Sequence, residues 1–187
     1  MSLDRILLGI LRKPASGYDI KQQFEKVFRH FWSADLAQIY RALAKLEKEG
    51  LLERRTEPSA RGPDRKVYTR TAAGSERLRE WLAEGPVFGT EKFTYLAQAF
   101  FLAEAAPEER IAFYEALRER LMEQHATLAA IEQNWRQSGG ADFPANLDEA
   151  DFHSYLTLDM GVQKTRALVE WADASLARIH ARTRKRN

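Results

Sequence analysis

The sequence contains no cysteine, which excludes disulfide scaffolds, thiolate zinc sites and cysteine nucleophiles. It also has no run that approaches the ~18 apolar residues of a membrane span. The apolar stretch at the start of the chain has Asp4 and Arg5 at its head and lacks a small-residue cleavage site, so it does not resemble a signal peptide. These absences favour a cytoplasmic protein with no membrane partner.

Residue sets for catalysis or metal binding are also missing. The histidines form no HxxxH or HExxH pair, so a metal site is not expected; they are His30, His125, His153 and His180. The acidic groups at 108–109 and 148–151 fall at the starts of expected helices, where capping and the helix dipole account for them. Gly139-Gly140 lacks the spacing of a phosphate loop. Because no nucleophile, base and orienting group can be assembled, we expect neither an enzyme nor a cofactor.

What the chain does have is enough apolar sequence for a core and an uneven charge. Of its 187 residues, 44% are hydrophobic, which suffices for a packed core, and 30% are charged, which favours a helical and well-solvated surface. Residues 1–84 hold 17 Lys and Arg against 12 Asp and Glu, a net charge of +5, whereas residues 85–187 hold 12 against 15, a net charge of −3. This asymmetry suits a nucleic-acid-binding head on a non-binding body.

Three helices are predicted in the first 50 residues. Residues 3–11 have helical spacing, and Ser16 is expected to cap a second helix over 17–30. Asp35 is expected to cap a third helix that runs to Glu49, with Gly50 as its left-handed C-terminal residue. The side chains expected to face the core are Leu3, Ile6, Leu7, Ile10 and Leu11 in the first helix, Tyr18, Ile20, Phe24, Val27 and Phe28 in the second, and Leu36, Ile39, Leu43 and Leu46 in the third.

A β-hairpin and a fourth helix follow. Residues 51–56 and 65–70 are predicted strands, joined by a tip rich in turn-forming residues. Thr71 is expected to cap the fourth helix, which runs through Leu78, Trp81 and Leu82 and ends near Gly85-Pro86. We place the domain boundary at the start of segment 86–92, which gives domains 1–85 and 86–187.

The second domain is predicted to be entirely helical. One helix covers about 93–104, a second runs from Pro107 to Gly139-Gly140, and Asp148 caps a last helix that reaches about 183. A helix of this length spans about 50 Å, which exceeds what one small domain covers, so we expect part of its apolar seam to meet a second chain. The residues expected to form this dimerisation surface are Tyr155, Leu158, Val162, Leu168, Val169, Trp171, Leu176 and Ile179.

Together these elements predict a mainly α protein, with an N-terminal winged helix-turn-helix (three helices plus a β-hairpin wing) followed by an α-helical dimerisation domain. The third helix of such a fold fits the major groove of DNA, where Gln and Arg reach base edges and Lys reaches phosphates. The candidate DNA-binding residues are Gln38, Tyr40, Arg41, Lys45 and Lys48 on the third helix, and Arg61, Arg65 and Lys66 on the wing.

Specific motifs carry a family resemblance. The sequence has GYDI at 17–20, IYRALAKLEKEGL at 39–51, RKVY at 65–68 and TAAG at 71–74. In this combination, over residues 3–82, it resembles the PadR family of bacterial transcription regulators. Phe31-Trp32 and the long helical second half are similar to the virulence-regulator (AphA-like) branch, the second half by its layout.

The resemblance implies a homodimer that exchanges its terminal helix between subunits, binds pseudo-palindromic operators in double-stranded DNA and usually represses the regulated genes. Some family members release DNA when a phenolic acid or a flat hydrophobic drug binds. Two departures mean that the base preference of the family is not carried over: the third helix opens with Asp35-Leu36-Ala37-Gln38 instead of a run of small residues, and Arg41 stands where many members have proline.

Simpler interpretations remain open at this point. The cations of the third helix also fit a merely solvated face, Tyr40 fits either a structural role or a phosphate contact, and Arg61 fits a plain loop residue. Winged helices can also bind proteins through the third helix, and a weaker rival is a small-molecule enzyme in the helical half. Aromatic residues of that half fit either a core or a pocket for a small aromatic effector; the pocket candidates are Phe93, Phe100, Phe101 and Trp171.

Overall fold

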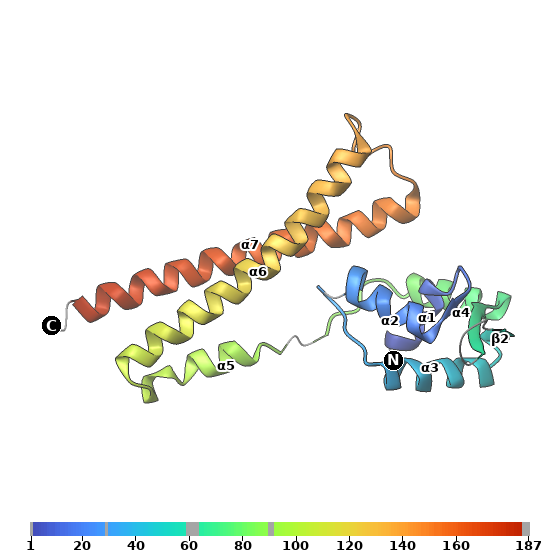
Figure 1. Cartoon of the computed structure of the whole chain (residues 1–187), viewed down its shortest axis with the longest axis horizontal. Coiled ribbons are helices and arrows are strands. Elements are labelled where there is room, and N and C mark those ends of the chain that lie inside the picture. Colours follow the sequence, from blue (N-terminus) through green and yellow to red (C-terminus); the bar gives the residue numbers. More distant parts are fainter. Residues whose placement is uncertain (1, 29, 59–63, 90–91, 185–187) are drawn as a thin grey trace. The chain divides into compact units, whose positions relative to one another are not determined.

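The computed structural model describes residues 2–28, 30–58, 64–89 and 92–184. Its contacts divide the chain into two compact units, Met1–Thr90 (unit 1) and Glu91–Asn187 (unit 2), and each unit is described by itself. Figure 1 shows a small mixed unit of helices and strands and a second unit made of helices. Among the described helices, none is long and apolar enough to cross a bilayer.

Unit 1 is built on the predicted helices and their caps. Its helices are α1 (Ser2–Ile10), α2 (Gly17–Gln23), α3 (Leu36–Lys48) and α4 (Ala72–Ala83). The side chains of Ser16, Asp35 and Thr71 each accept a hydrogen bond from a backbone N–H in the first turn of the helix that follows, as predicted. Gly50 has φ +72°, which confirms it as the left-handed residue after α3.

A three-stranded antiparallel sheet completes unit 1. β2 (Leu52–Glu57) pairs with β3 (Arg65–Arg70), which confirms the predicted hairpin. A two-residue strand, β1 (Ala15–Ser16), pairs with the other edge of β3, so the strand order is β1-β3-β2. The sequence did not predict β1, because two residues show no alternation of apolar and polar side chains.

The core of unit 1 lies between α1, α2, α3 and the base of the sheet. Leu7, Ile20, Ile39 and Leu43 are fully buried there. Three residues that were expected to face this core are exposed instead: Tyr18, Val27 and Leu36.

The exposure of Val27 has a clear physical cause. After Gln23, α2 continues as a π-helical turn over Phe24–Phe28, and the wider turn shifts the phase of the side chains that follow. Val27 therefore leaves the buried face, and the helical segment ends at Phe28, short of the predicted residue 30. Tyr18 lies about 200° around α2 from the buried Ile20 and so cannot share its face, and Leu36 lies in the first turn of α3.

Unit 2 is a long helical hairpin preceded by a short helix. The predicted helix 93–104 is divided into α5 (Thr94–Phe100) and a 3₁₀ turn (Leu102–Glu104). Two long helices follow, α6 (Pro107–Gly139) and α7 (Glu149–Arg184), and α6 begins at Pro107 as predicted. Pro144 in the connecting loop follows a cis peptide bond.

The seam of α7 packs against α6 of the same chain. Leu128 of α6 forms a small core with Leu158 and Val162 of α7. His125 Nδ1 lies 3.1 Å from Thr165 Oγ1, and Arg118 pairs with Asp173 nearer the end of α7. The two helices therefore run antiparallel in one register. The length of α7 alone therefore does not require a second chain to cover its seam, because α6 is nearly as long (Figure 1).

Candidate nucleic-acid interface

The helix α3 is held rigidly by its cap and its apolar face. Asp35 Oδ1 accepts a hydrogen bond from the Gln38 backbone N–H at 2.7 Å, and Gln38 Oε1 accepts one from the Asp35 backbone N–H at 3.1 Å. This reciprocal capping box fixes the first turn. Leu43 and Leu46 are buried against α1, α2 and the sheet, so the opposite face of α3 is left to solvent.

At the centre of that exposed face lies a stripe of two alanines and two cations. Because α-helical residues are about 100° apart, Ala37, Arg41, Ala44 and Lys48 share one side of the helix. All four are exposed, and the structure shows no ion pair between Arg41 or Lys48 and any other described residue. Alanines beside the cations leave room for a close approach to a partner, and the cations supply donors for phosphate or base edges. Sequence reasoning named Arg41 and Lys48 but missed the alanines, which helical periodicity could have found.

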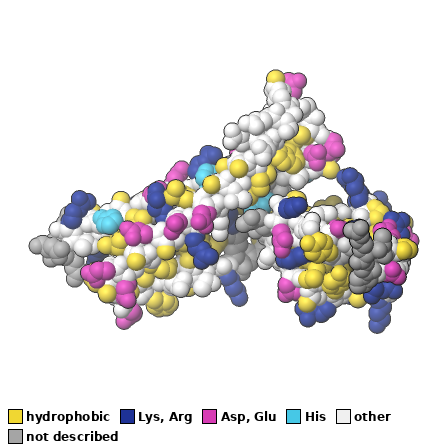
Figure 2. Space-filling view, viewed as in Figure 1, with side chains coloured by type: hydrophobic (Ala, Val, Ile, Leu, Met, Phe, Trp, Pro, Cys, Tyr) yellow, Lys and Arg dark blue, Asp and Glu magenta, His cyan; other side chains and the backbone are white. Residues whose placement is uncertain are grey.

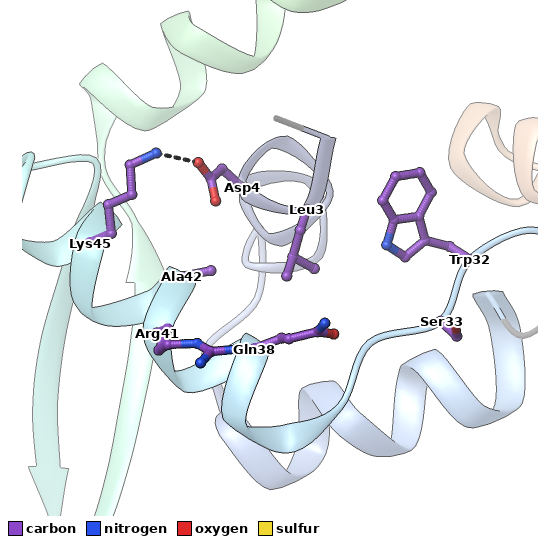
Figure 3. Close-up of a pocket in the computed structure, with 8 residues that line it drawn as sticks. All are labelled: Leu3, Asp4, Trp32, Ser33, Gln38, Arg41, Ala42 and Lys45. Atoms are coloured by element: carbon purple, nitrogen blue, oxygen red, sulfur yellow. Dashed lines mark hydrogen bonds and ion pairs between the residues drawn. The ribbon is translucent and has the colours of Figure 1, made fainter. Parts of the chain in front are cut away.

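The other three predicted residues of α3 have roles within the protein. Gln38 uses its amide oxygen in the capping box. The ring of Tyr40 covers Gly17 so closely that a Cβ on Gly17 would lie 2.6 Å from a ring carbon, which favours the structural interpretation of Tyr40. Lys45 Nζ lies 2.5 Å from Asp4 Oδ2, and the hydrogen bond to this carboxylate raises the pKa of Lys45 (Figure 3).

An open groove of about 400 Å³ runs along one side of α3. Figure 3 shows Gln38 and Arg41 on one wall of this groove, and Leu3 and Trp32 lie across from them. The remaining lining residues are Asp4, Ser33, Ala42 and Lys45. Arg41 and the indole of Trp32 therefore lie on opposite sides of the groove.

The wing contributes two of its three predicted cations. Lys66 of β3 is exposed, and Arg65 at the start of β3 forms an ion pair with Asp19 of α2. Arg61 lies outside the described residues. The two arginines of β2 are partnered, since Arg54 pairs with Glu47 at 3.2 Å and Arg55 with Glu57 at 2.7 Å.

Cations therefore gather along α3 and at the start of β3, and Figure 2 shows several Lys and Arg side chains on the edge of unit 1 along which α3 runs. Two of these cations form ion pairs with carboxylates: Lys45 pairs with Asp4, and Arg65 pairs with Asp19. Sequence reasoning missed both, because each pair joins residues more than 40 positions apart in the chain.

Four of the eight residues predicted for dimerisation contact α6 of the same chain. Tyr155 accepts a hydrogen bond from Arg136 at 3.0 Å, Trp171 lies beside Tyr114, and Leu158 and Val162 are buried in the hairpin. The remaining members of the set are half-buried, as Trp171 also is; they are Leu168, Val169, Leu176 and Ile179. Apolar side chains that the hairpin leaves exposed are Met122, Leu156 and Met160.

The candidate effector residues do not form one cluster in the described parts of unit 2. Phe100 and Phe101 contact each other at 5.1 Å between ring centroids, and both are exposed. Phe93 contacts Tyr95 at 5.6 Å and lies under Lys164 Nζ, whereas Trp171 packs beside Tyr114 of α6.

Comparison with known families matches both halves of the chain. Residues 6–80 match the transcriptional regulator PadR-like family. Residues 92–180 match the C-terminal domain of the virulence activator alpha family. The two matches follow one another along the chain. The first covers the winged helix and the second covers the helical hairpin.

Curated and solved relatives agree with these matches. The negative transcriptional regulator PadR of Bacillus subtilis is 30% identical over 175 residues, which cover 92% of this chain and 94% of the relative. Its crystal structure with operator DNA is 29% identical, with a TM-score of 0.81 and coverage of 94% of this chain and 96% of that one. The same regulator has been crystallised with p-coumaric acid, at 29% identity, a TM-score of 0.68 and 95% coverage of both chains.

The Vibrio cholerae virulence activator AphA has a similar structure, with 27% identity, a TM-score of 0.72 and coverage of 96% of this chain and 98% of that one. The resemblance drawn from the motifs is thus confirmed, including its AphA-like branch. This chain belongs to the PadR-like family, which is a family of transcriptional regulators and not of enzymes.

Proposed function

We propose that this protein is a sequence-specific DNA-binding regulator that inserts α3 into the major groove. The observation that carries the proposal is the exposed stripe of Ala37, Arg41, Ala44 and Lys48, in which both cations lack an ion-pair partner among the described residues. Such a stripe suits base readout by Arg41 near the first half of the helix and a phosphate contact by Lys48 near its end. A relative of the same layout has been crystallised with operator DNA, which supports this use of the fold.

We further propose that the protein acts as a homodimer on a pseudo-palindromic operator and represses the genes it regulates. In a two-fold dimer, two α3 helices enter successive major grooves, about 34 Å apart. Because α6 already covers much of the α7 seam, we assign the dimer surface to the half-buried residues of α7 together with Met122, Leu156 and Met160. Support for repression comes from the B. subtilis relative, which is named a negative regulator.

Release from DNA by a small aromatic effector is part of the same proposal. The support is the relative crystallised with p-coumaric acid and the aromatic residues of unit 2. With p-coumarate as the probe, operator affinity should fall as the compound is added, and tryptophan fluorescence should report binding. The pocket candidates Phe93, Phe100, Phe101 and Trp171 are then tested by alanine substitution. If operator affinity is unchanged at saturating p-coumarate, phenolic acids of this kind are not the effector.

The decisive test is a selection of bound fragments from random duplex DNA, followed by affinity measurements on the selected site. We expect Arg41→Ala to weaken specific binding by about 1–3 kcal/mol, the usual worth of a bidentate base contact. The matched control is Arg79→Ala, which removes the same charge from the exposed surface of α4, a helix that packs mainly on α1 and β3. The affinity of the Arg79→Ala variant for the selected site should stay near that of the wild type.

The rival interpretation is a winged helix that binds another protein through α3. It predicts a negligible and salt-insensitive affinity for any duplex, because no phosphates would be neutralised. The proposed function instead predicts that affinity falls steeply as the salt concentration rises. If the selection enriches no sequence and Arg41→Ala binds random duplex as well as the wild type does, the DNA-binding proposal is wrong.

A further inference from the structure

One carboxylate oxygen in unit 1 collects three donors from two different elements. Asp19 Oδ2 accepts the backbone N–H of Ser16 at 2.8 Å and the Ser16 hydroxyl at 2.8 Å. The same oxygen also accepts a hydrogen bond from Nη2 of Arg65. The first two bonds belong to the cap of α2, whereas the third comes from the wing. Asp19 thus does more than cap a helix.

The strand β1 explains why these groups meet. Ser16 pairs with Val67 in the register of β1 and β3, and Asp19 lies in the first turn of the helix that follows Ser16. Arg65 lies two residues before Val67, so the two side chains leave the same face of β3. The start of α2 is therefore fixed against the first half of β3 by strand pairing and by an ion pair.

Within the described parts of the chain, Arg65 uses one of its N–H donors, which leaves the others for a partner. A guanidinium has five N–H donors in a fixed fork, and the hydrogen bond that the structure gives Arg65 to Asp19 uses Nη2 alone. The side chain of Arg65 is 51% exposed, so its remaining donors can reach solvent. The negative charge of Asp19 is already met by three donors, which reduces its repulsion of a nearby phosphate.

The geometry points to Asp19 as a positioning residue for DNA binding, which orients the guanidinium of Arg65 toward a backbone phosphate beside the wing. This inference rests on the proposed function. Its physical reason is that a long arginine side chain loses rotamer freedom when it binds, and a side chain already held in place loses less. Lys66, the neighbouring cation of the wing, has no ion pair with a described residue and gains no such assistance.

The protonation state of Asp19 is consistent with this role. Burial alone raises the pKa of Asp19, but the hydrogen bonds from Ser16 and the pairing with Arg65 outweigh it and hold the pKa below the usual value for aspartate. Asp19 is therefore ionised at neutral pH.

The first test compares Asp19→Asn with the wild type on the selected operator over a range of salt concentrations. Asparagine keeps an oxygen for the cap but loses the charge that holds Arg65. We expect weaker binding and a slope of log affinity against log salt that is smaller by about one, as for Arg65→Ala. Glu76→Gln removes an equal charge from the exposed Glu76–Arg79 pair of α4 and should change neither quantity.

Two further comparisons separate positioning from simple stabilisation of α2. If Asp19 acts through Arg65, the double variant D19N/R65A binds no worse than R65A alone. Ser16→Ala weakens the cap but leaves the ion pair, so thermal stability should fall while the salt slope stays at the wild-type value. Additive losses in the double variant would overturn the positioning role.

A second pair of variants separates the loss of the Asp19 charge from a folding defect. Asp19→Glu and Asp19→Gln both satisfy the S-x-x-E/Q capping pattern and differ only in charge. We expect D19E to restore the wild-type salt slope and D19Q to lack it. Equal slopes for the two variants, or tighter binding by D19N, would overturn the inference while the proposed function stands. If the wild type binds no duplex at all, the proposed function and the inference both fail.

Discussion

Individual side chains on the exposed side of α3 either hold the fold or face solvent. Tyr40 packs on Gly17, and Lys45 is drawn to Asp4, so neither is free to move without a cost to the fold. Arg41 and Lys48 form no ion pair with another described residue. Specificity in the major groove is therefore expected to depend more on Arg41 than on the cations at the edges of the helix.

Gly74 is the clearest case of a residue fixed by space. A Cβ added to Gly74 would lie 2.2 Å from the carbonyl oxygen of Leu51, which is a backbone atom that cannot turn away. We expect Gly74→Ala to separate α4 from the start of β2 and to lower the free energy of unfolding by about 1–3 kcal/mol, as overpacked cores do. Urea unfolding followed by circular dichroism measures this loss.

The control for Gly74→Ala is Gly9→Ala in α1. Nothing lies within 4 Å of a Cβ added at Gly9, and alanine is the better helix former, so this variant should be more stable by about 0.5–1 kcal/mol. A Gly74→Ala protein as stable as the wild type would show that α4 can shift without loss.

Among the elements, the helix caps could be predicted from the sequence, whereas the strand pairing of β1 and the long-range ion pairs could not. Ser16, Asp35 and Thr71 could be predicted because a cap depends on residues three positions apart. The strand β1 could not, because its two residues become a strand only through pairing with β3. Likewise, the ion pairs of Asp4 and Asp19 join distant segments and leave no pattern in the sequence, so the free cations could not be separated from the partnered ones.

The cap of α2 predicts a pH dependence of stability. The folded pKa of Asp19 is below its unfolded value, so the unfolded chain binds more protons in the acid range and stability rises with pH there. The contribution of Asp19 is complete above about pH 4, the unfolded value for aspartate, and is lost as the pH falls through the lower folded pKa. Urea unfolding between pH 5 and 2 should therefore show a smaller loss of stability for Asp19→Asn than for the wild type; equal losses would contradict the assignment.

Two leucines of α7 separate the hairpin contact from the proposed dimer surface. Leu158 is 6% exposed against α6, whereas Leu156 is 44% exposed. We expect Leu158→Ala to lower the free energy of unfolding by about 2–5 kcal/mol, the usual cost of truncating a buried leucine. Leu156→Ala should cost less stability and should instead raise the dimer dissociation constant in sedimentation equilibrium. Equal effects of the two variants on stability would contradict this division of the helix.

At the scale of the whole molecule, an apolar seam on a long helix indicates burial but does not identify the chain that provides it. The spacing along α7 is regular, yet its central residues meet α6 of the same chain. The identity of the covering helix depends on the antiparallel return after the loop that follows Gly139, which no local periodicity encodes. The core of the helical hairpin thus forms within one chain, and in the proposed dimer a second copy packs on the side chains that the hairpin leaves exposed.

In the proposed dimer, the helical hairpins of the two chains hold the two DNA-binding units at a fixed separation. Val169→Pro tests whether operator binding depends on this arrangement. Proline in a helix interior removes a hydrogen bond and clashes with the preceding turn, at a cost of about 3 kcal/mol or more. Val169 is half-buried in the middle of α7, so we expect loss of the dimer in sedimentation and loss of operator affinity, while unit 1 stays folded. Val169→Ala keeps the helix and removes only part of one side chain from the proposed dimer surface, so it should weaken the dimer and the operator affinity far less than proline does. A monomeric Val169→Pro protein that binds the palindrome as tightly as the wild type would show that each head acts alone, because two linked heads bind a paired site more tightly than one head can.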